Sequence, residues 1–140
     1  MPMWEPFPER TRRVFVRAQE KARERRSGII DVGDFLSAVA EREDQIGLLV
    51  RGSVDFTQLE AERAPVDSSE PMTFAAGVKR MIEFSFEEAR SFGDDFVGSA
   101  ALVLGALRVD PPVPLQPGVD LAEVRRQLAA LRFADAPPAT

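Results

Sequence analysis

Two stretches of the chain decide the fold: residues 7–41, FPERTRRVFVRAQEKARERRSGIIDVGDFLSAVAE, and residues 74–108, FAAGVKRMIEFSFEEARSFGDDFVGSAALVLGALR. A shift of 67 residues, from Phe7 to Phe74, lays the first on the second without a gap and leaves five identical positions. Apolar positions also match, since Ile29 meets Phe96. An ungapped repeat inside 140 residues predicts two copies of one supersecondary unit that pack against each other.

The spacing of apolar residues predicts helices in both copies. Residues 9–25 and the stretch after Thr73 carry apolar stripes at helical spacing, and Gly28 and Gly93 follow where these helices should end. A second helix follows in each copy, capped by Asp31 and Ser99. The first copy continues with helices over about 44–51 and after Asp55, and the chain closes with one from Asp120 to about Phe133. No segment indicates a pair of strands.

The predicted organisation is therefore an all-α, pseudo-twofold tandem repeat of a four-helix motif within one domain. Repeat one covers about 7–63, a Pro- and Ser-rich linker covers 64–71, and repeat two covers about 72–133. The second repeat should lack one helix, because four prolines stand in residues 110–118 and proline removes backbone donors. Residues 134–140, rich in Ala and Pro, are expected to fray.

Composition excludes several classes of function. The net charge of −5 disfavours a nucleic acid partner, and the absence of cysteine removes disulfides, thiolate nucleophiles and Cys-based metal sites. No apolar run is long enough for a membrane span or signal peptide, so a cytoplasmic location without membrane contact is expected. Without His, Cys or Tyr, acid–base work would fall to Lys or to carboxylates such as Asp94 and Asp95, which are typical of a solvated turn. We expect no catalysis, metal or cofactor.

Several motifs resemble the double repeat of the Clp N-terminal domain, the docking module at the front of ClpA/ClpC-type unfoldases. These are Phe-Pro-Glu-Arg-Thr-Arg-Arg-Val from Phe7, Ala-Gln-Glu-Lys-Ala from Ala18, Glu-Glu-Ala-Arg from Glu87 and Val-Asp-Leu from Val119. The opening Met-Trp-Glu-Pro-Phe is similar to the start of the ClpC subfamily. The resemblance covers about residues 3–133 and implies the same fold.

The chain departs from this family at the start of the second helix of each repeat. Family members carry Gly-Thr-Glu-His there, and in ClpC-type domains the glutamate helps to receive phosphorylated arginine. Here Gly33 and Ala100 stand at the glutamate positions, so the carboxylate that a guanidinium needs is missing from both. Asp34 lies one residue along and projects about 100° away on a helix, which makes it a poor substitute.

The resemblance also implies a partner-binding surface near the start of the first helix and on the first helix of the second repeat. The residues that match this surface are Met3, Trp4, Phe15, Phe74, Lys79, Glu83 and Phe86. An apolar patch rimmed by Lys79 and Glu83 would suit a partner helix or peptide. The alternative is that Phe15 and Phe86 are plain core, since aromatic stripes on helices are usually buried.

The expected function is non-catalytic binding of a protein or peptide. The partner would be a Clp unfoldase, its adaptor or a substrate, and the protein would act as an adaptor, decoy or regulator of Clp-dependent proteolysis. The sequence has no G-x-x-x-x-G-K-[ST] motif, and because it diverges strongly from the usual family motifs we expect a free-standing Clp N-domain without a motor. Two alternatives stay open: the receptor segment at the N-terminus of a full ATP-dependent unfoldase, and a phosphoarginine sensor with a relocated pocket.

Overall fold

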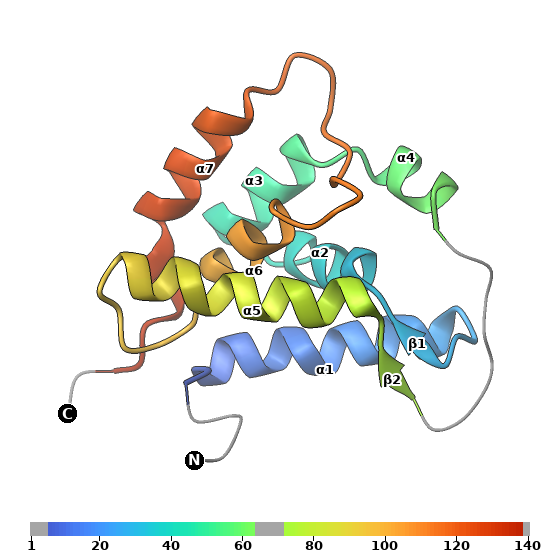
Figure 1. Ribbon diagram of the computed structural model, residues 1–140, viewed down its shortest axis with the longest axis horizontal. Helices are drawn as coiled ribbons and strands as arrows, with labels where there is room; N and C mark the ends of the chain where they lie inside the picture. Colours follow the sequence, from blue (N-terminus) through green and yellow to red (C-terminus); the bar gives the residue numbers. More distant parts are fainter. Residues whose placement is uncertain (1–5, 64–71, 139–140) are drawn as a thin grey trace.

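The computed structural model describes residues 6–63 and 72–138, and Figure 1 shows its arrangement. This part of the chain is mostly helical, with seven α-helices, a short 3₁₀ helix and two short strands. In chain order they are α1 (Glu9–Glu24), β1 (Ile29–Ile30), α2 (Val32–Ala40), α3 (Gln45–Ser53), α4 (Phe56–Ala61), β2 (Thr73–Phe74), α5 (Ala76–Ser91), α6 (Ser99–Ala106), α7 (Leu121–Ala130) and η1 (Arg132–Asp135).

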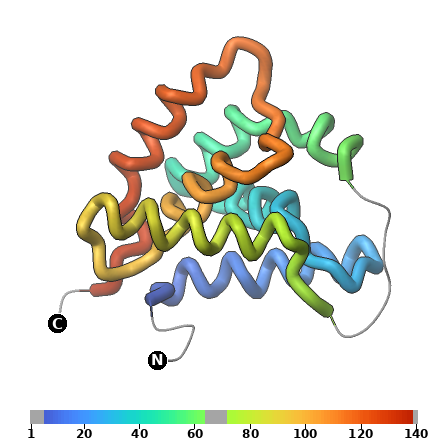
Figure 2. Tube along the Cα trace, in the orientation of Figure 1, coloured from blue at the N-terminus to red at the C-terminus, as the bar shows by residue number. Residues whose placement is uncertain are grey.

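The helices follow the 67-residue repeat closely. Adding 67 to the bounds of α1, residues 9 and 24, gives 76 and 91, which are the bounds of α5. Adding 67 to the first residue of α2, Val32, gives Ser99, the first residue of α6. Each long helix packs on the short helix that follows it, α1 on α2 and α5 on α6. The short helices α2 and α6 also contact each other and lie between the long helices and α3 and α7 (Figure 2).

A two-stranded parallel sheet corrects the expectation that no strands pair. Thr73 N–H donates to Gly28 C=O at 2.9 Å, and Ala75 N–H donates to Ile30 C=O at 2.9 Å. Strands of two residues are too short to show an alternating pattern, which explains why the sequence does not reveal them. The pairing gives hydrogen-bond partners to the backbone carbonyls of Gly28 and Ile30 in the turn after α1.

The same contact recurs on the other side of the molecule. Val97 N–H donates to Pro6 C=O at 2.8 Å, so the segment before α1 meets the turn after α5. In the sheet, the segment before α5 meets the turn after α1. The two halves of the chain are therefore interlocked, since each supplies backbone partners to the other.

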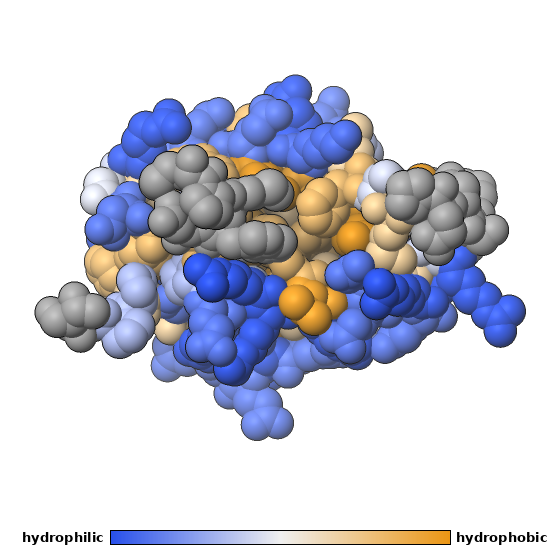
Figure 3. Space-filling view, turned by 90° about the horizontal axis from the view of Figure 1, so that it is seen from below, coloured by the Kyte–Doolittle hydropathy of each residue, from blue (hydrophilic) through white to orange (hydrophobic). Residues whose placement is uncertain are grey.

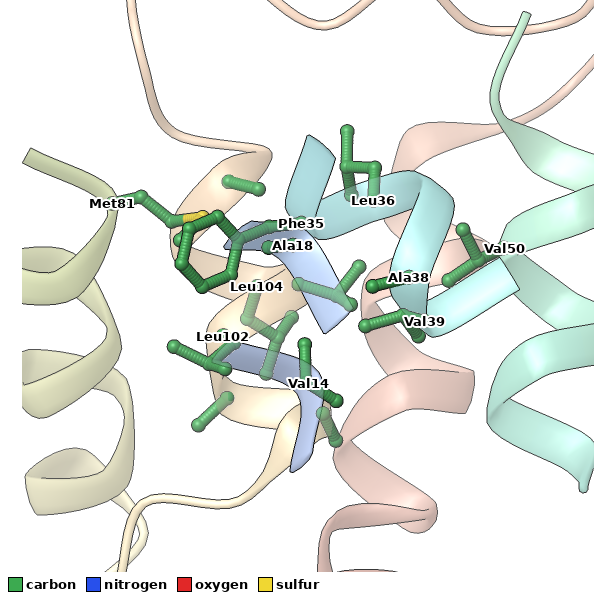
Figure 4. Packing of buried hydrophobic residues seen from close by; sticks show 14 of the residues in the cluster. Val14, Ala18, Phe35, Leu36, Ala38, Val39, Val50, Met81, Leu102 and Leu104 are labelled. Atoms are coloured by element: carbon green, nitrogen blue, oxygen red, sulfur yellow. The ribbon is translucent and has the colours of Figure 1, made fainter. Parts of the chain in front are cut away.

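The core gathers around α2 and α6, as Figure 4 shows in close view. All eight residues of α6 are buried, and α2 contributes Phe35, Leu36 and Val39. Gly105 is needed for the close approach of α6 to α5, because a Cβ there would lie 2.4 Å from the Met81 carbonyl oxygen. Replacing this glycine would force the two helices apart.

The proline-rich segment forms no helix, as the prolines predict. It is nevertheless fastened to the corner between α3 and α4. Asp55 N–H donates to Pro114 C=O at 2.9 Å, and Gln116 N–H donates to Ser53 C=O at 2.9 Å. This segment, residues 109–116, therefore lies across the first half of the molecule in a defined position.

A buried carboxylate, that of Asp135, fastens the start of the C-terminal segment to the body of the molecule. Asp135 is 3% exposed and accepts hydrogen bonds from the Thr11 hydroxyl at 2.8 Å and the Ser99 N–H at 3.1 Å. Arg42 Nη2 lies 2.7 Å from its Oδ1. These partners are far from Asp135 in sequence, so the local Ala-Pro composition could not reveal them. Burial alone would raise the pKa of Asp135, but Arg42, Ser99 and Thr11 hold it below its ordinary value.

Replacing Asp135 with Asn should lower the free energy of unfolding by about 2 kcal/mol at pH 7, because the buried donors of Thr11, Ser99 and Arg42 lose an ionised acceptor. Arg42 keeps Asp44 as a charge partner, which limits the loss. Because the pKa of this carboxyl is lowered in the folded state, its contribution is present above its ordinary pKa and is lost as the pH falls. Urea unfolding followed by circular dichroism, at pH 7 and at decreasing pH, measures both effects. The exposed Asp95→Asn should stay within about 0.5 kcal/mol of the wild type. An Asp135→Asn loss as small as that of the control would contradict this account.

A surface ion cluster joins α1 to the end of α2 and gives a second pH-dependent prediction. The Glu41 carboxylate accepts hydrogen bonds from Arg17 Nε at 2.7 Å and Lys21 Nζ at 2.6 Å. These two cations lower the pKa of Glu41 to about 2. The Glu41 side chain is 45% exposed, so solvent screening limits the loss on Glu41→Gln to about 1 kcal/mol at pH 7. The difference between wild type and variant should vanish as the pH falls from 4.5 towards 2. A pH-independent difference would show that the charge is not involved.

Candidate protein-binding site

A hollow of about 250 Å³ opens between α1 and the β1–β2 sheet; we call it the apolar hollow. It is lined by Phe15, Val16, Gln19, Ile30, Met72, Thr73 and Phe74. None of these residues is charged. Figure 3 views the molecule from the α1 side and shows apolar surface gathered on this face between hydrophilic borders. An uncharged hollow of this kind can receive apolar side chains of another molecule.

Two adjacent residues of α1 give the hollow its floor and its rim. Phe15 belongs to the inward stripe of α1, is only 4% exposed and packs edge-on against Phe35 at a ring distance of 5.0 Å. Its ring also lies 6.5 Å from that of Phe74, the last residue of β2. Val16 lies off the stripe and is 57% exposed. The floor is thus part of the core, while the rim is available to a partner.

The structure divides the residues that the sequence assigned to the partner-binding surface. Phe15 and Phe74 come together in the apolar hollow. Phe86 packs against Phe7 instead, at a ring distance of 5.6 Å. Lys79 and Glu83 are exposed on α5, but neither lines the hollow. Met3 and Trp4 lie outside the described residues.

Sequence reasoning missed five lining residues: Val16, Gln19, Ile30, Met72 and Thr73. One signal was present for Val16, since an apolar residue off the stripe of an amphipathic helix must face solvent. Ile30 and Thr73 are brought to one place by the pairing of β1 with β2, and the sequence contained no visible strand signal for either.

The start of α2, where the resemblance implies a phosphoarginine position at Gly33, is occupied by arginines of the chain itself. Asp31 and Asp34 form a capping box, in which Asp31 accepts the Asp34 N–H at 2.9 Å and Asp34 accepts the Asp31 N–H at 3.0 Å. Arg25 binds Asp34 with contacts of 2.7 and 3.1 Å, and Arg63 binds Asp31 at 2.9 and 3.2 Å. A Cβ on Gly33 would lie 2.6 Å from Arg63 Nη2, so the guanidinium occupies the space beside this glycine.

Neither candidate phosphoarginine position offers a free carboxylate among the described residues. Asp34 is 1% exposed; burial raises the pKa of its carboxyl, although Arg25 acts in the opposite direction. Ala100 is fully buried, and the adjacent Ser99 N–H is taken by Asp135. The carboxylates at the start of α2 and the Ser99 N–H at the start of α6 therefore already have partners within the molecule.

Residues 6–63 and 72–138 contain neither a metal-binding cluster nor a membrane-spanning helix. No group of three or more His, Cys, Asp or Glu side chains in these ranges is placed to hold a metal ion. None of their helices has the length and apolar content that crossing a bilayer requires.

The fold is similar to that of the N-terminal domain of the caseinolytic protease associated chaperone ClpD from Arabidopsis thaliana. The TM-score is 0.60 at 22% identity, and the match covers 96% of this chain and 94% of that one. A likeness at this identity concerns the fold alone.

The sequence is 28% identical over 142 residues to the ATP-dependent Clp protease ATP-binding subunit ClpA homolog of Guillardia theta. This match covers 92% of this chain and 17% of that protein. The sequence is 30% identical over 115 residues to the chloroplastic chaperone protein ClpC1 of Oryza sativa subsp. japonica, covering 76% and 12% respectively. The chain thus spans less than a fifth of the length of these relatives. Residues 6–113 match the family described as Clp repeat (R) N-terminal domain. The chain belongs to the Clp N-terminal repeat family.

Proposed function

We propose that the protein is a non-catalytic protein- or peptide-binding module that acts as an adaptor, decoy or regulator of Clp-dependent proteolysis, and that its partners dock in the apolar hollow. The observation that carries this proposal is the exposed Val16 on the rim of a hollow lined only by uncharged residues. Its relatives bear the names of Clp chaperones and Clp protease subunits, which supports a partner from the same system.

Burial of a few anchors would supply most of the binding energy. Val16, Met72 and Phe74 present apolar surface that a partner side chain would remove from water, at about 25 cal/mol per Å². Interfaces usually draw their affinity from such a small central set, with polar groups at the rim setting orientation. On this proposal, Lys79 and Glu83 act at the periphery of a larger partner.

We also propose the division of the chain into repeat one at 7–63, a linker at 64–71 and repeat two at 72–133, related by a pseudo-twofold axis. Support comes from the equal lengths and the 67-residue offset of α1 and α5, and from the reciprocal backbone contacts that join the halves. The missing third helix of repeat two leaves its place to the proline-rich segment.

A receptor segment of a longer ATP-dependent unfoldase is the alternative role for the same hollow. The small share of each relative that the chain spans favours it. Docking in the hollow is common to both roles, so one binding experiment tests the shared part. The phosphoarginine alternative has less support, because the starts of α2 and α6 are filled by internal ion pairs.

Val16→Asp should weaken binding of an unfolded polypeptide, such as fluorescently labelled, reduced and carboxymethylated α-lactalbumin, by about tenfold or more, because a charge would have to be buried on the rim. Fluorescence anisotropy measures the dissociation constant. Leu48→Asp is the matched control, since Leu48 is 61% exposed, lies on α3 and does not line the hollow. Equal binding by both variants, or an equal loss in both, would overturn the assignment of the hollow.

A further inference from the structure

A second hollow, of about 300 Å³, shares no lining residue with the apolar hollow. It lies between α4, the starts of α2 and α5, and residues 109–113; we call it the proline-walled groove. Its apolar lining includes Val32, Leu59, Val109, Pro111, Pro112 and Val113. The groove therefore has enough apolar surface to bury an aliphatic side chain.

Two opposite walls of the groove are held at a fixed separation. One wall is α4, and the other is the proline-rich segment that stands where a helix of the second repeat would be expected. Hydrogen bonds of 2.9 Å from Asp55 N–H to Pro114 C=O and from Gln116 N–H to Ser53 C=O join them beside the groove. A groove that is formed before binding avoids part of the ordering cost of binding.

The charges around the groove are unbalanced. Its lining holds three acids, Asp31, Glu62 and Asp110, and one base, Arg63. Arg63 is already paired, with Asp31 at 2.9 Å and with Glu60 at 2.6 Å. Glu62 and Asp110 are exposed, and neither forms an ion pair with any residue of 6–63 or 72–138. Two carboxylates without cations thus stand on the two walls, one on each side.

We propose that the proline-walled groove binds an extended peptide segment in which branched aliphatic residues are flanked by arginine or lysine. The aliphatic side chains fill the space between Leu59 and Val113, and the flanking cations pair with Glu62 and Asp110. An acidic or phosphorylated segment would be repelled by the same carboxylates. The groove is a second docking surface, separate from the one proposed for the apolar hollow.

The test compares three labelled tetrapeptides, with blocked ends, by fluorescence anisotropy at low ionic strength: Arg-Val-Leu-Arg, Glu-Val-Leu-Glu and Arg-Ser-Ser-Arg. Only the first should bind measurably, and the affinity should fall with added salt because the rim charges are screened. Chemical-shift changes in the labelled protein should centre on Leu59, Gly77 and Val113. Preference for the acidic peptide, or shifts centred elsewhere, would overturn the proposal.

Charge-removing variants locate the interaction. Glu62→Gln combined with Asp110→Asn should weaken Arg-Val-Leu-Arg binding about fivefold, since exposed charge pairs contribute modestly. The matched control, Glu43→Gln combined with Asp95→Asn, removes two acids outside the groove and should change the affinity less than about twofold. None of the four sites is buried, so folding is retained. If both double variants weakened peptide binding equally, the binding would depend on net charge alone, and the assignment of the peptide site to the groove would be wrong.

Two more measurements distinguish peptide binding in the groove from binding in the apolar hollow and from self-association. Val16→Asp should leave Arg-Val-Leu-Arg binding unchanged, so failure of the apolar hollow and failure of the groove are distinguishable. Sedimentation equilibrium over a range of concentrations tests the competing occupant. Self-association that Glu62→Gln/Asp110→Asn abolishes would assign the groove to a second copy of the chain and overturn the peptide proposal.

Discussion

The burial of α2 and α6 at the centre of the molecule is the constraint on which the rest of the structure depends. The first N–H groups of a buried helix cannot be solvated, so they need partners inside the protein. The chain meets this need with charged side chains at both helices. Asp31 and Asp34 serve α2, and Asp135 serves α6, where it accepts the Ser99 N–H at 3.1 Å. Each buried carboxylate in turn needs a cation, supplied by Arg25 and Arg42.

This internal pairing bears on Gly33 and Ala100, the positions at which the sequence resemblance implies a glutamate in other family members. A side chain at position 33 would lie against the Arg63 guanidinium, and position 100 has no exposed surface. A ligand guanidinium would have to displace Arg25 or Arg63 from carboxylates that already serve as caps. The absence of a carboxylate at positions 33 and 100 and the internal ion pairs nearby are therefore two aspects of one arrangement, in which charged side chains at the starts of α2 and α6 stabilise the fold.

Much of the helical framework was predictable from the sequence because its signals are local. Apolar stripes, capping aspartates and prolines place α1, α2, α5 and the irregular segment at 110–118 within a few residues. The β1–β2 pair, the role of Asp135 and the position of Arg63 depend on partners tens of residues away, which no local pattern encodes. For the apolar hollow, the family resemblance pointed to Phe15 and Phe74, whereas Met72 and Thr73 line the hollow through tertiary contacts that no local pattern encodes.

The two halves of the chain differ most at the proline-rich segment and at α4. The prolines remove a helix from the second half, and the segment that replaces it crosses to Ser53 and Asp55 of the first half. That crossing builds one wall of the proline-walled groove, while α4, none of whose residues is buried, builds the other. The apolar hollow, by contrast, rests on α1 and the backbone contact that interlocks the halves. The apolar hollow therefore follows from the shared fold, whereas the proline-walled groove follows from the prolines of this sequence. The groove is for that reason the better place to look for a partner specific to this protein.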